Sequence, residues 1–264
     1  MGGTWKCPKC GTVLSVSQPS SECPSCARPN GCDTVLFDRM YWRTGNSCMK
    51  RTLRRHEWQT TARGNLHIPS TTFPQRWKTD AATLEYLSGK TDIPLPHLQC
   101  TFEDDGAFYH LTEYVPGVSM RDLAEPDKEV VKDELLQHTK TLQSLCSDTP
   151  GVPGQELLCP PLRVNSDNWK VNSCWKPRAD LPRHDYVFCH NDLGQHNIIV
   201  DPETLKINAI IDWEYAGFWP KWFEGDFWKR AGPSVALDGE IDDRERCREW
   251  LMENCEEVVM PPLQ

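Results

Sequence analysis

The residues best suited to chemistry lie in one segment from His190 to Asn197 and in a second that begins at Asp212. An apolar run follows the first segment and another precedes the second, and the turn-forming residues 201–204 separate the two runs. Turn formers between two apolar runs predict a β-hairpin. A tight turn there would bring Asn197 close to residues 210–212 on the returning strand.

These side chains suit phosphoryl transfer from a nucleotide. The reaction needs a carboxylate near the attacking hydroxyl and hard oxygen ligands that hold Mg²⁺ against the phosphates. Asp192, Asn197 five residues later and Asp212 across the hairpin can supply these groups. The apolar strands would give them a rigid support. In the alternative interpretation, the polar residues only cap the turns of an ordinary hairpin.

The whole segment resembles the catalytic loop and metal-binding turn of the aminoglycoside phosphotransferase family, which shares the protein-kinase-like fold. The resemblance covers most of residues 33–245 and is strongest from Tyr186 to Gly217. It implies an α+β, bilobal fold with an antiparallel β N-lobe and a mainly helical C-lobe that carries the catalytic hairpin. It also implies ATP as the donor and a small molecule with a hydroxyl as the acceptor.

The resemblance also implies roles for individual residues. Asp192 would be the catalytic base, Asn197 and Asp212 would be Mg²⁺ ligands, and His190 would hold the loop in shape without reacting. The opening of the loop is also similar to the choline kinases, which usually carry a Gly before the Asn. This chain has His196 there, and we assign no role to it.

The resemblance extends to a lysine that binds phosphates. Lys50 lies on a predicted strand where the family places such a lysine, and a compact ammonium suits the α- and β-phosphates. The family pairs this lysine with a Glu in the following helix, whereas this chain offers Asp80, with Glu85 as a competing candidate. Because Asp is one methylene shorter than Glu, we expect a loose Lys50–Asp80 pair.

Residues 113–117 resemble the hinge that joins the two lobes. There the backbone groups of Glu113 and Val115 would bind the edge of the adenine base. A glycine-rich phosphate loop is not found in the sequence, since only Gly45 lies in the corresponding region.

Hydrophobic patterns predict the elements that must position these residues. The expected strands cover residues 33–53, 107–115, 186–189, 198–200 and 207–211. The expected helices cover residues 79–88, 127–146 and 243–254. Residues 54–78 are expected to form an irregular polar loop, and the prolines between Thr149 and Arg183 argue against regular structure there.

A separate metal site is predicted near the N-terminus. Cys7 and Cys10, then Cys23 and Cys26 after twelve intervening residues, form two Cys-x-x-Cys pairs. Four thiolates at this spacing can surround Zn²⁺ as a tetrahedron. Such a closed site is structural because no coordination position remains for a substrate.

We therefore expect two units, a zinc-ribbon module at residues 1–32 and a kinase-like phosphotransferase domain at residues 33–264. Within the second unit, the N-lobe would cover residues 33–115 and the C-lobe residues 118–264. Acidic residues crowd the C-terminal part, where they form either the lining of a site for an amine-bearing substrate or a solvated surface.

Composition bounds the function classes. The chain of 264 residues has a net charge of −9, which argues against nucleic acid as a partner. It contains no apolar run of membrane-spanning length and no signal core at its N-terminus, so we expect a cytoplasmic protein without membrane contact. Thirteen cysteines in such a protein argue against a disulfide framework.

Three functions are compatible with these features. The first is an active small-molecule kinase. The second is a catalytically weak pseudokinase that acts as a binding scaffold through its zinc ribbon, motivated by Asp80 and by the short chain after Trp228. The third is a zinc-ribbon nucleic-acid binder, which the negative charge disfavours.

Overall fold

The computed structural model describes residues 31–61, 63–165, 172–181 and 185–262, together with the backbone of two short N-terminal strands. These strands, β1 (Gly3–Lys6) and β2 (Val13–Val16), pair as an antiparallel hairpin. The predicted zinc ligands lie outside the described residues, and the zinc ribbon therefore stays a prediction. These ligands are Cys7, Cys10, Cys23 and Cys26.

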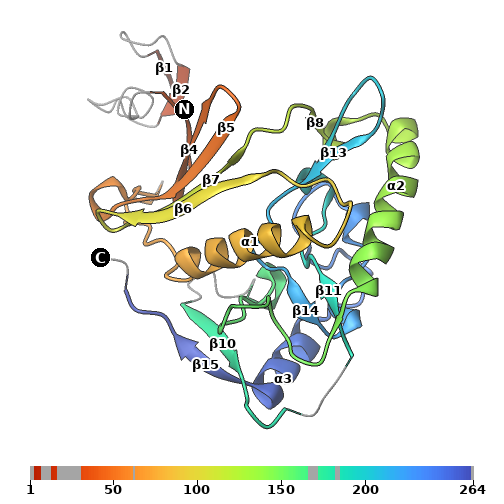
Figure 1. Cartoon of the computed structure of the whole chain (residues 1–264). Coiled ribbons are helices and arrows are strands. Elements are labelled where there is room, and N and C mark those ends of the chain that lie inside the picture. Colours follow the sequence, from red (N-terminus) through yellow and green to blue (C-terminus); the bar gives the residue numbers. More distant parts are fainter. Residues whose placement is uncertain are drawn as a thin grey trace.

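A five-stranded antiparallel sheet forms the first half of the described chain (Figure 1). Its strands, in spatial order, are β3 (Cys32–Val35), β4 (Arg39–Thr44), β5 (Ser47–Thr52), β7 (Ala107–Glu113) and β6 (Leu98–Asp104). Two-residue turns set the register. Gly45 has a φ of 56° in the β4–β5 turn, and Asp105 and Gly106 have φ of 46° and 69° in the β6–β7 turn. Such left-handed residues are those that tight hairpins require.

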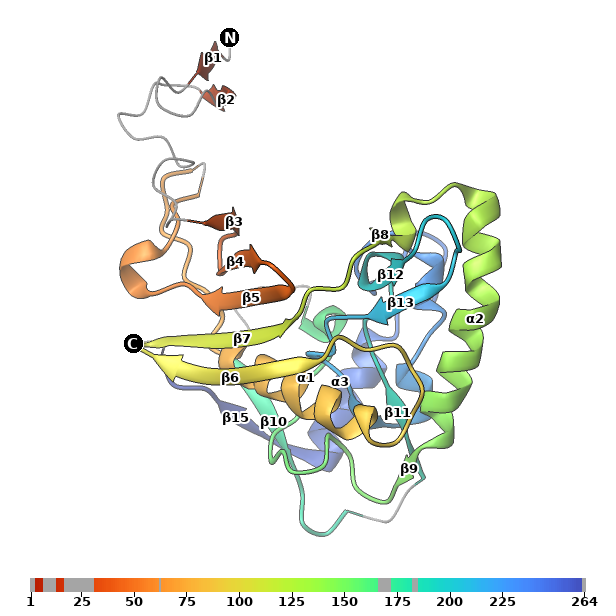
Figure 2. The same ribbon diagram turned by 45° about the horizontal axis from the view of Figure 1, so that its top comes forward.

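Helix α1 (Phe73–Ser88) lies along β6 and β7 (Figure 1 and Figure 2). It begins six residues before the predicted start, so the prediction of an irregular loop is wrong for residues 73–78. Pro74 in the first turn suits a helix start. Phe73 and Trp77, one turn apart, pack against Phe108 of the sheet, and this contact with β7 is not visible in the local sequence.

The second half of the chain is built around helix α2 (Glu125–Ser144), strand β11 (Tyr186–Cys189) and the hairpin of β12 (Ile198–Val200) and β13 (Ile207–Ile210). The hairpin register pairs Ile198 with Ile210, which confirms the predicted turn. One apolar core joins α1, α2, β11 and the hairpin, so the hairpin stands on a rigid base.

Short strands complete this half. Strand β11 lies between β14 (Gly217–Trp219) and β9 (Cys146–Ser147), and β12 lies between β13 and β8 (Val118–Ser119). The 3₁₀ turns are Arg55–Glu57, Met120–Asp122, Leu162–Asn165, Gln195–Asn197, Lys221–Phe223 and Phe227–Lys229.

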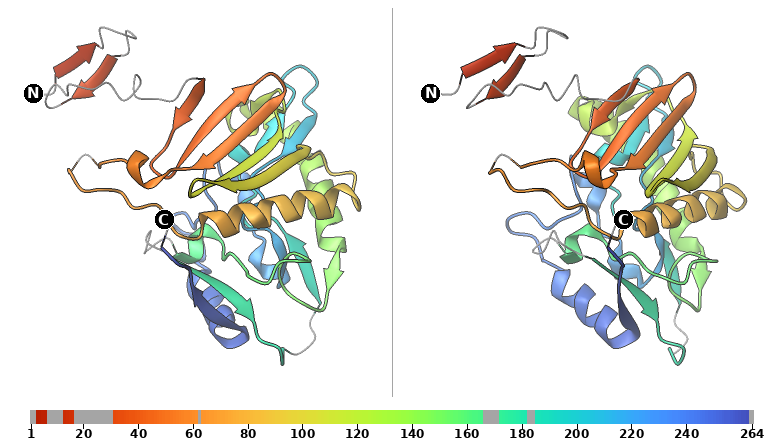
Figure 3. Two further views of the ribbon diagram at one scale, coloured as in Figure 1. Left: turned by 60° about the vertical axis from the view of Figure 1, so that its left-hand side comes forward. Right: turned by 90° about the vertical axis from the view of Figure 1, so that its left-hand side faces the viewer.

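Strand β10 (Ser173–Pro177) lies inside the proline-rich stretch for which no regular structure was expected, and that prediction is wrong here. It pairs with β15 (Cys255–Val259), which follows helix α3 (Arg244–Asn254) (Figure 3). Its partner is almost eighty residues away, so local patterns could not indicate it. Among the helices described, none has both the length and the apolar character needed to cross a bilayer.

The core around α2 gives a test of this packing. Leu135 is completely buried in it, whereas Val130 on the same helix is 58% exposed. Leu135→Ala should lower the free energy of unfolding by about 2–5 kcal/mol, because it removes apolar contacts and leaves a cavity. Urea denaturation measures this, and Val130→Ala should change the value by less than about 0.5 kcal/mol. Equal effects of the two variants would contradict the described burial.

Candidate active site

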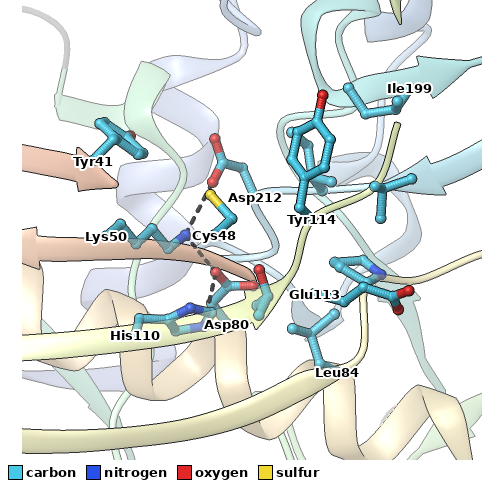
Figure 4. Close-up of a pocket in the computed structure, with 14 residues that line it drawn as sticks. Tyr41, Cys48, Lys50, Asp80, Leu84, His110, Glu113, Tyr114, Ile199 and Asp212 are labelled. Carbon is cyan, nitrogen blue, oxygen red and sulfur yellow. Dashed lines mark hydrogen bonds and ion pairs between the residues drawn. The ribbon is translucent and has the colours of Figure 1, made fainter. Parts of the chain in front are cut away.

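An ion-pair network stands at the centre of the site, in which Lys50 and Asp80 are buried and Asp212 is partly exposed (Figure 4). The Lys50 ammonium lies 2.6 Å from Asp80 Oδ2 and 3.1 Å from Asp212 Oδ1. Lys50 comes from β5, Asp80 from α1, and Asp212 follows β13. The sequence left Asp80 and Glu85 as competing partners; Asp80 makes the contact and Glu85 is exposed. The expected loose pair is wrong, because α1 packs close enough to the sheet for the shorter side chain to reach.

Asp80 also ties the helix to the chain beyond Asp212. Its Oδ1 accepts a hydrogen bond from the backbone N–H of Trp213 at 3.3 Å. On its other side, Nε2 of His110 lies 3.3 Å from Asp80 Oδ2. Burial lowers the pKa of His110 to about 4, so this histidine is neutral at pH 7 and adds no positive charge.

Two carboxylates thus share one ammonium group. Burial would lower the pKa of Lys50, but Asp80 and Asp212 outweigh it and raise this pKa. Burial would likewise raise the pKa of Asp212, but Lys50 and Arg39 outweigh it and lower this pKa. Lys50 and Asp212 are therefore both charged at neutral pH, and Asp212 keeps a charge that a divalent cation can use.

His190 connects the loop of Asp192 to the strand end that carries Asp212. The backbone N–H of Asp192 donates to Nδ1 of His190 at 3.2 Å, and Nε2 of His190 lies 3.0 Å from the carbonyl oxygen of Ile211. The two bonds together require a neutral ring with its proton on Nε2, and burial lowers the pKa of His190 accordingly. The ring therefore fixes the spacing between the two segments.

Asn197 lies directly against Asp192. Its Nδ2 donates to the backbone oxygen of Asp192 at 2.9 Å and to Oδ2 of the same residue at 3.2 Å. The backbone carbonyl oxygen of Asn197 accepts the N–H of Ile211 at 2.9 Å, which confirms the predicted approach of Asn197 to residues 210–212. Since Nδ2 faces Asp192, the side-chain oxygen lies on the other side of the amide.

The Asp192 carboxylate has two further neighbours that the sequence did not indicate. Its Oδ1 accepts the backbone N–H of Ser234 at 3.0 Å, and its Oδ2 lies 3.6 Å from Nε2 of His196. Burial would raise the pKa of Asp192, but His196 and Ser234 outweigh it and lower this pKa. The carboxylate is therefore ionised at neutral pH, as a base must be.

The Glu224 side chain supports the same loop by binding its backbone. Its Oε2 accepts the backbone N–H groups of His190 at 2.5 Å and Asn191 at 3.0 Å. Asn191 has a left-handed φ of 68°, which these bonds help to hold. Sequence analysis placed Glu224 only among the acidic residues of the C-terminal part, since nothing in its local pattern shows that it turns inward.

A cavity of about 220 Å³ opens between the five-stranded sheet and the hairpin. Figure 4 shows Lys50, Asp80 and Asp212 along it, with Tyr114 and Glu113 of the expected hinge nearby. Apolar side chains complete its lining, namely Leu84, Ile199 and Ile211. The cavity thus joins an apolar slot to a charged end.

The oxygen donors fit magnesium. Asp212 offers a charged carboxylate and Asn197 an amide oxygen, and Mg²⁺ usually takes one or two such protein ligands together with phosphates and water. Within the described residues, no group of three or more His, Cys, Asp or Glu side chains could hold a metal ion by itself.

Comparison with known proteins identifies the family. The profile of the family described as "Phosphotransferase enzyme family" matches residues 38–225. The chain belongs to this family. The match includes every residue of the network and of the loop from His190 to Asn197, and it ends before Ser234.

Curated relatives of this phosphotransferase are aminoglycoside 3'-phosphotransferases. The one from Streptomyces fradiae is 27% identical over 151 residues, which are 50% of this chain and 56% of that enzyme. The one from Streptomyces ribosidificus is 25% identical over 202 residues, which are 63% of this chain and 76% of that enzyme. The chain therefore spans little more than half of the first relative.

Solved structures give matches of the same kind. Aminoglycoside phosphotransferase APH(3'')-Id from Streptomyces rimosus has 18% identity and a TM-score of 0.48, and the match covers 84% of this chain and 92% of that one. Aminoglycoside-3'-phosphotransferase of type VIII has 17% identity and a TM-score of 0.44, with 71% and 73% covered. The predicted family and the α+β, protein-kinase-like fold are confirmed by the family match.

The ion-pair network gives a stability prediction. Lys50→Met should lower the free energy of unfolding by about 3–5 kcal/mol, because Asp80 is left buried without its cation. Lys78 on α1 is the matched control, since it pairs with Glu103 at 3.1 Å with 46% of its side chain exposed. Lys78→Met should cost less than about 1 kcal/mol. Chemical denaturation compares the two, and similar losses would refute a special role for the buried network.

Glu224 gives a prediction about pH. Burial raises its pKa from 4.5 to about 7, so the folded state binds a proton there that the unfolded state has released. This contribution to stability is complete below pH 4.5 and is lost as the pH rises through 7. Relative to Glu224→Gln, the wild-type chain should lose on the order of 1–3 kcal/mol over this range. Denaturation midpoints of both chains between pH 4.5 and pH 8 measure it, and a constant difference would contradict the prediction.

Proposed function

We propose that this phosphotransferase moves the γ-phosphoryl group of ATP to a hydroxyl of a small molecule. One observation carries the proposal: a single cavity joins the hinge segment to the Lys50–Asp80–Asp212 network, and His190 links that network to the loop of Asp192. Nucleotide, metal and base positions are therefore adjacent, as phosphoryl transfer requires.

The nucleotide would lie in the cavity with its base in the apolar slot. The backbone N–H of Glu113 already donates to the carbonyl of His97 at 2.8 Å. The donor toward the adenine edge would therefore come from Val115, and the acceptor from the carbonyl of Glu113. Lys50 would contact the α- and β-phosphates and is held for this purpose by Asp80.

Asn197 and Asp212 would hold Mg²⁺, which supplies charge neutralisation at the phosphates when it is bound. Asp192 would accept the proton of the attacking hydroxyl. Its ionised state and its contact with Asn197 favour this role, because the base must lie beside the metal-bound phosphate without binding the metal itself. His190 would hold the loop in shape through its two hydrogen bonds.

The acceptor class is proposed from charge and from the relatives. The curated relatives are named as aminoglycoside phosphotransferases, and this chain carries a net charge of −9. A cationic acceptor, such as an amino sugar or a choline-like amine with a hydroxyl, suits that charge. The short Lys50–Asp80 distance removes one of the two reasons for the pseudokinase alternative.

The domain division belongs to the same proposal. A structural zinc ribbon would occupy residues 1–32, and the phosphotransferase lobes would occupy residues 33–115 and 118–264. The family match at residues 38–225 falls within the second unit and supports its start after residue 32.

The base provides the decisive test. Asp192→Asn keeps the shape of the side chain but cannot accept the proton, so turnover should fall about 10²- to 10⁴-fold. Consumption of ATP with Mg²⁺ should be screened against amino sugars, choline-like amines and other small alcohols. A thermal shift with Mg²⁺ and ATP should persist in the variant, because the nucleotide site is intact.

The matched control for this test is Asp201→Asn. Asp201 accepts the backbone N–H groups of Glu203 and Thr204 in the exposed hairpin turn. Because this turn does not contact Asp192, the substitution should leave turnover unchanged. Full turnover by Asp192→Asn would remove the assigned base. The absence of both turnover and Mg²⁺-dependent ATP binding in the wild-type chain would sink the proposed function as a whole.

A further inference from the structure

A short segment beyond the family match lies along the catalytic loop. We call residues 230–235 the strap. The N–H of Gln195 donates to the carbonyl of Arg230 at 2.8 Å, and the N–H of Ser234 donates to Oδ1 of Asp192 at 3.0 Å. Between them, a Cβ placed on Gly194 would lie only 2.5 Å from the carbonyl oxygen of Gly232. Every second residue of the strap therefore lies against the loop, and the strap runs antiparallel to it.

The first residue of the strap and the chain just beyond its last residue are both held in place. The Arg230 guanidinium pairs with the carboxylate of Glu240 and stacks over the ring of Phe227, with its Cζ 5.0 Å from the ring centroid. The same carboxylate accepts the N–H of Leu237 at 3.1 Å. The strap is therefore a defined covering of the loop and not a free end.

Ser234 is the strap residue that reaches the reaction centre. It is 3% exposed, and its hydroxyl oxygen is buried without a hydrogen bond of normal geometry to any described residue. Because the N–H of the same residue donates to Asp192 Oδ1 at 3.0 Å, the hydroxyl lies within one side chain's length of that carboxylate. A buried hydroxyl without a partner is destabilising, and its presence beside the proposed base calls for a functional reason.

Ser234 lies where a phosphoryl acceptor would have to lie. A hydroxyl that attacks the γ-phosphate must lie beside the base that takes its proton. The strap brings an alcohol oxygen of the chain itself to within one side chain's length of that base. In the same conformation it covers Asp192, which is 9% exposed, so an external acceptor cannot reach the base freely.

We propose that Ser234 is an intramolecular phosphoryl acceptor, to which this chain transfers the γ-phosphoryl group of its own ATP. The inference rests on the proposed function. In the step, the bond between the γ-phosphorus and the β,γ-bridging oxygen breaks, and a bond from that phosphorus to Oγ of Ser234 forms. The hydroxyl proton passes to Asp192 and then to water. The products are ADP and phosphoserine, and no further reactant is needed.

The modification would also move the strap. A phosphate group adds a charge of about −1.5 to −2 at pH 7. It would form next to the Asp192 carboxylate, with which the strap is already in contact. Repulsion in this partly buried site disfavours the closed strap. Phosphorylation of Ser234 would therefore uncover the loop for external acceptors.

The test uses the full chain with ATP and Mg²⁺ and without any acceptor. Intact-mass measurement should show the gain of one phosphoryl group per chain, and peptide fragmentation should place it on Ser234. The rate should be first order and independent of protein concentration, because the transfer is intramolecular. Ser234→Ala and Asp192→Asn should abolish the gain.

Two further variants control for folding and for general reactivity. Ser234→Thr keeps a hydroxyl and should still gain phosphate. Ser144→Ala removes an exposed serine at the end of α2 and should leave the gain unchanged. A thermal shift with Mg²⁺ and ATP shows for each variant that the nucleotide site is folded.

Several outcomes would overturn the inference. An unmodified Ser234 in a chain that phosphorylates an amino sugar would refute it and leave the proposed function intact, with the strap as a passive cover. Phosphate on Ser234 at the wild-type rate in Asp192→Asn would refute Asp192 as the base of this step, and a rate that rises with protein concentration would refute transfer within one chain. A chain with neither modification nor turnover nor ATP binding would refute both proposals together.

Discussion

The shared ammonium of Lys50 is the interaction on which the rest of the site depends. Lys50 belongs to the sheet, Asp80 to the helix on it, and Asp212 to the end of the hairpin, so one cation holds three separate elements together. Buried charges are stable only with partners, and each element therefore constrains the other two. Through His190 the constraint extends to Asp192, which also contacts Asn197 at the base of the hairpin.

The parts of the site that could be predicted from the sequence are those set by local spacing. The hairpin register, and with it the approach of Asn197 to residues 210–212, follows from the length of one turn. The partners of Glu224 and Ser234 could not be predicted, because each meets the catalytic loop from more than thirty residues away. The same holds for the pairing of β10 with β15 and for the early start of α1, which depends on Trp77 packing against the sheet.

Acidic residues of the C-terminal part illustrate a general limit of reading charge from sequence. Glu214 is buried and bonded to Arg76, and Asp243 accepts from Nε of Arg163 at 3.0 Å. Glu224 turns inward toward the loop. Such residues look alike in a sequence, yet some neutralise buried arginines and others face water. A net charge therefore describes the whole chain better than any one of its surfaces.

Asp212 has a left-handed φ of 60°, a conformation that residues other than glycine adopt rarely and at a cost of about 1–3 kcal/mol. Glycine would relax the backbone at this position, and asparagine would tolerate it, but both would remove the carboxylate that faces Lys50. The backbone conformation and the ion pair thus favour different residues at the same position. The strained aspartate ties the end of the hairpin to the ammonium group that also holds the helix, and this tie requires the carboxylate.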